Sequence, residues 1–294
     1  VSPSAPAPPV GALSYSALGE YARCGYRFYA QRVLGLPSPG PDRVGAPAAN
    51  SDPDSELSLA EAPRPSRSAV DRGVLIHALL ERLVFRRPVA PDLEAVFAAA
   101  RRAGLEPQPS EAEAAELAKL IERFAASELC RRLGRATNTR REERFAFSLP
   151  AGVLITGAID VLAREPGGRM LIVDYKSDRL DPGHSTNPAG LVEQSYATQR
   201  LVYALAALHA GATEVEVVYC FLEAPEVPVT TVCDATQRAQ LDARLAALAD
   251  GVLAHRFPVS ELPHRGLCRG CPAEGGLCSW PLEMTRREAP DRLF

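Results

Sequence analysis

Lysine is almost missing from this chain of 294 residues. Lysine and arginine together number 33, and only Lys119 and Lys176 are lysines. Arginine stays protonated at any accessible pH, whereas lysine carries a compact charge whose protonation can be adjusted. A sequence that uses arginine almost everywhere but keeps Lys176 two residues after Asp174 therefore indicates chemistry at that point that arginine cannot supply.

The chain also lacks long apolar runs and an excess of positive charge. No run reaches the roughly 18 residues of a membrane-spanning helix, so we expect no membrane partner. The net charge of −3 excludes a basic field over the whole surface but leaves room for a local arginine stripe. There are two candidate stripes. One consists of Arg64, Arg67 and Arg72, and the other of Arg131, Arg132, Arg135, Arg140 and Arg141. For each of these arginines, a position on a solvated helix face is an equally good explanation.

No secretory signal precedes the chain's first apolar segment, and no internal repeat is found. Residues 1–12 are rich in proline, alanine and serine, which predicts a flexible linker. The first residue is valine, which favours excision from a longer polypeptide. The chain has seven cysteines, an odd number. This favours metal ligation over disulfides and a reducing compartment, for which we expect the cytoplasm.

Hydrophobic periodicity predicts an α/β fold in one domain, 13–294. We expect a helix over 13–34, a long loop or insertion over 37–68, and a helical arm over 69–134 with helices at 69–85 and two more within 91–134. Ser110 and Glu113 form a capping box in this arm. A catalytic core over 141–255 follows, with strands at 145–149, 153–164, 170–177, 214–223 and 229–232 and helices at 191–210 and 236–255. These elements predict a central mixed sheet flanked by helices, followed by an irregular, cysteine-rich tail over 257–294.

Two aspartates and the rare lysine are predicted to converge on this sheet. A three-residue hairpin loop at Pro166–Gly168 places Asp160 opposite Asp174, on one face of the sheet. Lys176 shares that face because side chains alternate along a strand. Such carboxylates suit a hard divalent ion with phosphate oxygens, and the ion can activate water while lysine neutralises the phosphate. Strand-end caps with a surface ion pair are the alternative, which the scarcity of lysine disfavours.

Two helical patterns support the same reading. His77 and Glu81 lie four residues apart on one predicted helix face, and a neutral imidazole is a metal ligand. Tyr196, Gln199 and Tyr203 share one face of a later helix, where they can orient phosphate or water. An ordinary core histidine and structural hydrogen bonds are the alternatives.

The cysteines divide into two groups. Cys268, Cys271 and Cys278 lie close together in the tail, and Cys24 is a distant fourth thiol that completes a tetrathiolate site for Zn²⁺ or an iron–sulfur cluster. The alternative is a set of unliganded thiols. The other three cysteines are predicted to be buried and to act as small hydrophobic residues. They are Cys130, Cys220 and Cys233.

These motifs together resemble RecB-type members of the PD-(D/E)XK nuclease superfamily, the nuclease domains attached to bacterial helicase–nucleases of the RecB/AddB kind. The resemblance covers most of the chain and rests on Ser14-Tyr15-Ser16, Tyr21-Ala22-Arg23-Cys24, Gly73-x-x-x-His77, Gly157-Ala158-Ile159-Asp160, Asp174-Tyr175-Lys176 and Gln199-x-x-x-Tyr203. It implies that His77, Asp160 and Asp174 hold Mg²⁺ or Mn²⁺ and that Lys176 is catalytic, with Gln199 and Tyr203 in supporting roles. Gly25 departs from the pattern, because family members often have proline after the first cysteine.

The resemblance also implies a cofactor and a biological setting. It favours a structural [4Fe–4S] cluster on Cys24, Cys268, Cys271 and Cys278. It further implies a DNA exonuclease that works with a helicase motor, in the same polypeptide or on a separate chain, during DNA end processing and recombinational repair. A catalytically inactive, DNA-binding nuclease-like domain is the alternative, and the complete carboxylate and lysine set disfavours it. A zinc-stapled protein without nuclease activity is a third reading.

Overall fold

The computed structural model describes residues 8–38, 69–149, 152–178 and 187–289. Residues 39–68 of the predicted loop and residues 1–7 of the predicted linker lie outside this part. The chain forms two compact units. The sheet unit comprises Pro65–Phe147 and Thr156–Ala243, and the terminal unit comprises Val1–Arg64, Ser148–Ile155 and Arg244–Phe294.

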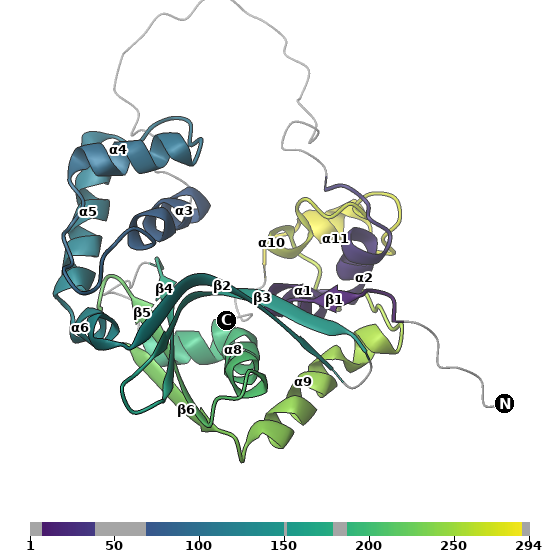
Figure 1. Cartoon of the computed structure of the whole chain (residues 1–294). Helices are drawn as coiled ribbons and strands as arrows, with labels where there is room; N and C mark the ends of the chain where they lie inside the picture. Colours follow the sequence, from purple (N-terminus) through teal and green to yellow (C-terminus); the bar gives the residue numbers. More distant parts are fainter. Residues whose placement is uncertain (1–7, 39–68, 150–151, 179–186, 290–294) are drawn as a thin grey trace, which may run out of the picture. The chain divides into compact units, whose positions relative to one another are not determined.

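A mixed sheet forms the centre of the sheet unit (Figure 1). Its strands are β2 (Asn138–Ser148), β3 (Leu154–Arg164), β4 (Met170–Lys176), β5 (Glu214–Phe221) and β6 (Val229–Asp234). β3 and β4 pair in antiparallel fashion, β4 and β5 in parallel, and β5 and β6 in antiparallel fashion. The predicted α/β class with a central mixed sheet is therefore confirmed.

The hairpin register agrees with the loop length. Arg164 pairs with Met170 and Val161 with Val173, and the Glu165 N–H donates to the Arg169 carbonyl at 3.0 Å. Gly168 has a φ of +88°, which glycine adopts without steric cost. The predicted turn at 166–168 is thus confirmed, and with it the opposition of the strands that carry Asp160 and Asp174.

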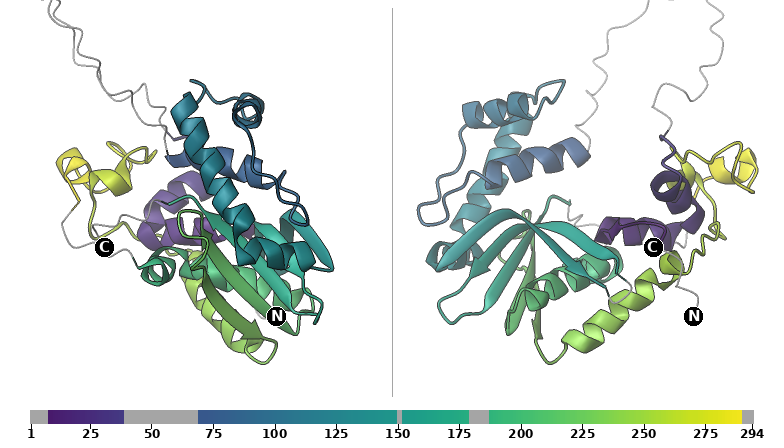
Figure 2. Two further views of the ribbon diagram at one scale, coloured as in Figure 1. Left: turned by 90° about the vertical axis from the view of Figure 1, so that its left-hand side faces the viewer. Right: turned by 45° about the vertical axis from the view of Figure 1, so that its right-hand side comes forward.

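Four helices form an arm on one face of this sheet, and the second of them packs on the other helices instead of on the strands (Figure 2). They are α3 (Ala69–Leu80), α4 (Leu93–Arg102), α5 (Glu111–Ala126) and α6 (Glu128–Arg135). The arm was predicted with three helices, and the fourth arises at Ser127, whose hydroxyl accepts from the Cys130 N–H at 3.1 Å and begins α6. The capping box is confirmed, since Ser110 Oγ accepts from the Glu113 N–H and Glu113 Oε2 from the Ser110 N–H.

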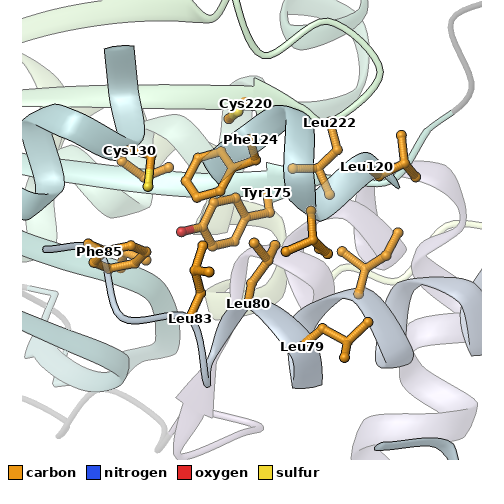
Figure 3. Close-up of a cluster of buried hydrophobic side chains, with 14 of the residues drawn as sticks. Leu79, Leu80, Leu83, Phe85, Leu120, Phe124, Cys130, Tyr175, Cys220 and Leu222 are labelled. Atoms are coloured by element: carbon orange, nitrogen blue, oxygen red, sulfur yellow. The ribbon is translucent and has the colours of Figure 1, made fainter. Parts of the chain in front are cut away.

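The arm and the sheet share one apolar core. Figure 3 shows Leu79, Leu80 and Phe124 of the arm packed around Tyr175 of β4 and Leu222, which follows β5. Every second residue of β4 faces this core, so the intervening residues, Asp174 among them, face the opposite side of the sheet.

The opposite side is covered by a broken helix. α7 (Pro188–Leu191) leads into a π-helix (Val192–Tyr196) and then into α8 (Ala197–His209). The sequence predicted one continuous helix over 191–210, and the π-turn ends that regularity just before the residues that meet β4. α9 (Arg238–Leu253) follows β6 and continues into the terminal unit.

The terminal unit contains the chain's first described elements and its tail. β1 (Ala12–Leu13) pairs in parallel with Leu154 and Ile155 at the start of β3. α1 (Tyr15–Arg23) is capped by Ser14. It is followed by α2 (Gly25–Phe28) and a π-helix (Tyr29–Val33), and the tail adds α10 (Arg265–Cys268) and α11 (Leu282–Arg286). Among the described residues, no helix has the length and apolar content needed to cross a bilayer.

The predicted single helix over 13–34 is wrong, because it breaks at Cys24. Cys24 has extended backbone angles, and its sulfur accepts from the Arg27 N–H at 3.5 Å at the start of α2. A Cβ on Gly25 would lie 2.8 Å from Pro258 Cδ. Glycine therefore permits the close approach of the tail here, a requirement that the sequence pattern does not reveal.

Candidate active site and metal centre

The strand ladder between β3 and β4 gives way to side-chain contacts next to Asp160. The ladder runs from Arg164–Met170 to Val161–Val173. At the next residue, Asp160 Oδ2 accepts the Tyr175 N–H at 2.9 Å. This bond fixes the carboxylate on the strand backbone and leaves its other oxygen available to a ligand.

His77, Glu142 and Asp160 form the group of described residues whose ligand atoms all lie within 4.8 Å of one another. His77 Nδ1 of α3 is 3.6 Å from Asp160 Oδ2 of β3 and 4.0 Å from Glu142 Oε1 of β2. One imidazole nitrogen and two carboxylates form a ligand set suited to a divalent metal ion.

Glu142 was missed by the sequence analysis. Its φ is +47°, a left-handed conformation that is uncommon for residues other than glycine and occurs often at functional sites. Residues 138–144 are all polar or charged, so hydrophobic periodicity could not place this side chain in a strand. Only the presence of a glutamate near the catalytic strands gave any signal for it.

Asp174 and Lys176 belong to a second, adjoining network with α8. Asp174 is 2% exposed, and its Oδ1 accepts from Gln199 Nε2 at 2.8 Å and lies 3.1 Å from the Tyr203 hydroxyl. That hydroxyl also donates to the Ala158 carbonyl at 2.9 Å; having one proton, it serves one acceptor at a time. The network holds the Asp174 carboxylate in place on two sides.

Gln199 bridges the carboxylate and the lysine. Its Oε1 accepts from Lys176 Nζ at 3.0 Å while its Nε2 donates to Asp174. The reverse amide orientation would set an NH₂ group against the ammonium, so the two charges fix the orientation. Lys176 Nζ also lies 2.7 Å from Asp174 Oδ2, although Oδ2 has no partner with hydrogen-bond geometry. We treat this contact as an ion pair, which leaves that oxygen with unused acceptor capacity.

The electrostatics of this site fit a cation. Burial, followed by the charge of Asp174, raises the pKa of Asp160 from 3.8 to about 8, against the opposing effect of the Tyr175 N–H. Burial also raises the pKa of Glu142, with further contributions from Glu81 and Asp174. A divalent ion relieves this excess of negative charge, because it favours the ionised carboxylates.

The residues predicted from sequence are therefore brought together in two adjoining groups. His77 and Asp160 lie with Glu142, and Asp174 and Lys176 lie with Gln199 and Tyr203. Asp174 is not within the span of the three-ligand group. Glu81 lies in the turn after α3, with its N–H still donating to the His77 carbonyl at 2.9 Å.

The proposed cysteine site lies in the terminal unit. Cys24, Cys268, Cys271 and Cys278 line one pocket together with Arg27 and Trp280. Burial first, and then the neighbouring cysteines, raise the pKa values of the Cys268 and Cys271 thiols. Cys130, Cys220 and Cys233 are buried, as predicted.

The predicted arginine stripes are largely neutralised. Ion pairs with glutamates engage Arg131, Arg132, Arg135 and Arg140. The Arg141 guanidinium lies 4.3 Å from the centre of the Phe85 ring, and Arg72 is buried and donates to the Ser177 carbonyl at 2.8 Å. Arg64 and Arg67 lie outside the described residues.

Comparison with known proteins points to one family. Over 128 residues, 38% of the chain, the sequence is 36% identical to an ATP-dependent helicase/nuclease subunit of Desulforudis audaxviator (strain MP104C). The match spans 10% of that protein's length. The crystal structure of a putative exonuclease from Eubacterium rectale superposes with a TM-score of 0.50 and 11% identity, over 92% of this chain and 91% of the other, and so shares the fold. The sequence profile of the PD-(D/E)XK nuclease superfamily matches residues 12–275, and the chain belongs to this superfamily.

Proposed function

We propose that this chain is a metal-dependent deoxyribonuclease that hydrolyses phosphodiester bonds at or near DNA ends. The observation that carries the proposal is the adjacency of His77, Glu142 and Asp160 to the Asp174–Lys176 pair within the sheet unit. Membership of a nuclease superfamily supports the reaction class, and the geometry supports the residues.

The residues of the chain divide the work between them. His77, Glu142 and Asp160 would hold Mg²⁺ or Mn²⁺, and Asp174 Oδ2, with its unused acceptor capacity, is a further proposed ligand. The ion would supply charge stabilisation at the phosphate and acidify a bound water.

Lys176 presents a positive charge beside these carboxylates, where it can neutralise a phosphate oxygen. Gln199 and Tyr203 hold Asp174 and Lys176 in register by the contacts described above. Preorganised groups of this kind need no rearrangement when charge develops in the transition state.

We further propose a helicase motor as the partner and DNA end processing in recombinational repair as the setting, in the cytoplasm. The likeness to a segment of a helicase/nuclease protein supports this association. The motor would belong either to the same polypeptide or to a separate chain.

A [4Fe–4S] cluster on Cys24, Cys268, Cys271 and Cys278 completes the proposal. Four thiolates around one zinc ion lie about 3.8 Å apart, because each Zn–S bond is about 2.3 Å. The four cysteines line one pocket, which suits a tetrathiolate site of either kind, and the family resemblance favours the cluster over a single zinc ion.

The test is cleavage of an end-labelled DNA duplex with and without Mg²⁺. Asp174→Ala should abolish Mg²⁺-dependent cleavage, and Asp174→Asn, which keeps the shape of the side chain, should do the same. Asp242→Asn is the matched control, because Asp242 pairs with His209 outside these networks. Undiminished digestion by both Asp174 variants would refute the site. A wild-type protein that binds DNA without cutting it would instead identify an inactive nuclease-like domain.

A further inference from the structure

Lys176 reaches its position through an aromatic enclosure as well as through its polar contacts. Its ammonium lies 3.7 Å from the centre of the Tyr196 ring and 5.3 Å from that of Tyr219. The two rings stack with centroids 5.6 Å apart and an interplanar angle of 19°. The lysine side chain is 12% exposed, so these π faces replace much of the water that a free ammonium would bind.

The backbone has an irregular conformation at Tyr196, the nearer of these two rings. Tyr196 is the last residue of the π-helix, and its φ of −121° and ψ of 6° lie outside the helical region immediately before α8. Single π-turns within α-helices are often found at functional sites. From this position Tyr196 meets Lys176, and Gln199 and Tyr203, on the next turns, meet Asp174.

A carboxylate holds the ring from its far end. The Tyr196 hydroxyl lies 3.0 Å from Asp178 Oδ2 and 3.2 Å from Oδ1. Asp178 follows β4 two residues after Lys176, so the strand that carries the lysine also fixes the ring beneath it. The attraction between an ammonium and the face of an aromatic ring strengthens when water is excluded.

We propose that Tyr196, supported by Tyr219 and Asp178, is the positioning residue of Lys176, holding its ammonium beside Asp174 through a cation–π contact. The inference rests on the proposed function for its catalytic consequence, but the contact itself can be measured without DNA or metal. Tyr196 acts through the lysine and need not touch the substrate.

The scarcity of lysine makes this contact directly observable. Protein labelled with ¹³C-lysine should give two Hε–Cε cross-peaks, from Lys119 of α5 and Lys176, and Lys176→Arg assigns them by removing one. Protons held over an aromatic face resonate upfield, so the Lys176 cross-peak should lie upfield of the Lys119 cross-peak. Lys119 serves as the internal reference for folding in every variant.

Substitutions at the two rings separate positioning from general structure. Tyr196→Leu should move the Lys176 cross-peak downfield, towards that of Lys119, and Tyr219→Leu should move it less, because that ring is farther away. Tyr196→Phe keeps the ring and should keep most of the upfield shift. In the cleavage assay Tyr196→Leu should lower kcat about tenfold with little change in KM, and Tyr196→Phe should retain most of the activity.

The outcomes distinguish the two proposals. A Lys176 cross-peak that coincides with that of Lys119, or that does not move in Tyr196→Leu, overturns the positioning role. If Tyr196→Leu fails to fold, the wild-type position of the peak and the Tyr196→Phe spectrum still decide the question. A shifted peak in a protein that cuts no DNA would refute the proposed nuclease and leave the enclosure intact.

Discussion

The Asp160 carboxylate is largely buried and lies near the negative charges of Asp174 and Glu142. Burial and Asp174 raise its pKa from 3.8 to about 8, so between about pH 4 and pH 8 the metal-free folded protein holds a proton that the unfolded chain has released. The stabilising effect of this proton is therefore fully present below pH 4 and is lost as the pH rises through about 8. Because Asp160, Asp174 and Glu142 interact, the titration belongs to the group.

We therefore expect the thermal midpoint of the metal-free protein to fall as the pH rises from 4 to 8. Asp160→Asn should flatten that slope, because asparagine does not ionise, and Mg²⁺ should flatten it in the wild type by replacing the proton. Thermal unfolding across this range, in a chelator and separately with Mg²⁺, measures the effect. Glu94→Gln is the control, because its partner Arg101 does not titrate in this range. Parallel curves for wild type and Asp160→Asn would contradict the assignment.

A second prediction concerns the neighbouring Tyr175, whose ring fills the core beneath the arm (Figure 3). Its hydroxyl is buried and has no hydrogen-bond partner among the described residues. Tyr175→Phe should raise the free energy of unfolding by roughly 1 kcal/mol, since it removes an unsatisfied polar group. Tyr203→Phe is the comparison variant. The Tyr203 hydroxyl donates to the Ala158 carbonyl, so its removal should lower the free energy of unfolding. Urea unfolding that ranks the two variants the other way would refute this reasoning.

At the scale of elements, one close approach fixes the docking of α6. A Cβ on Gly134 would lie 2.6 Å from the Phe85 carbonyl oxygen, which is backbone and cannot move aside cheaply. Gly134→Ala should therefore destabilise the sheet unit by about 1–3 kcal/mol despite alanine's higher helix propensity.

The same substitution in α1 provides the control. A Cβ on Gly19 would have nothing within 4 Å, so Gly19→Ala should be neutral or should stabilise by up to about 1 kcal/mol. Denaturant unfolding gives the free energy of unfolding of both variants. It thereby compares the gain from alanine's helix propensity at Gly19 with the steric cost of the added Cβ at Gly134. Equal effects at the two positions would show that the approach at Gly134 carries no cost.

Features set by local periodicity could be predicted from the sequence, and features set by packing could not. The hairpin register that aligns Asp160 with Asp174 follows from loop length and the two-residue period of strands. The helix breaks at Cys24, where the next residues pack against Pro258, more than two hundred residues away in the chain. The first half of β2 was missed because residues 138–144 are entirely polar and charged, so the segment shows no apolar alternation although it lies in the sheet.

In the candidate site, too, residues placed by regular periodicity were predicted and the others were missed. Asp174, Lys176, Gln199 and Tyr203 follow regular strand and helix periods and were all anticipated. Glu142 was missed because residues 138–144 contain no apolar residue, so no alternation identified this part of the chain as a strand. Helical spacing placed Tyr196 on the same face as Gln199 and Tyr203, but its ring contact with Lys176 was not anticipated, because that contact depends on how the helix packs against β4.

At the scale of the whole molecule, the terminal unit is assembled from distant parts of the chain. It combines Val1–Arg64, Ser148–Ile155 and Arg244–Phe294. Its N-terminal helices meet the tail through contacts such as the Tyr26 hydroxyl to the Leu277 carbonyl at 3.0 Å. A cluster ligated by Cys24 and the three tail cysteines would link these segments covalently through the metal and restrict the unfolded chain.

Cys24→Ser should therefore remove both the metal and much of the stability of this unit. In the chain-entropy model, a link between residues so far apart stabilises by on the order of 5 kcal/mol, because it closes a very long loop in the unfolded chain. We expect the anaerobically purified variant to lose iron and its broad visible absorption, and its terminal unit to unfold at a lower temperature. Cys233→Ser, in β6 and outside the pocket, should retain the iron. Full iron content in Cys24→Ser would exclude Cys24 as a ligand, and a colourless wild-type protein with stoichiometric zinc would replace the cluster by a single-ion site.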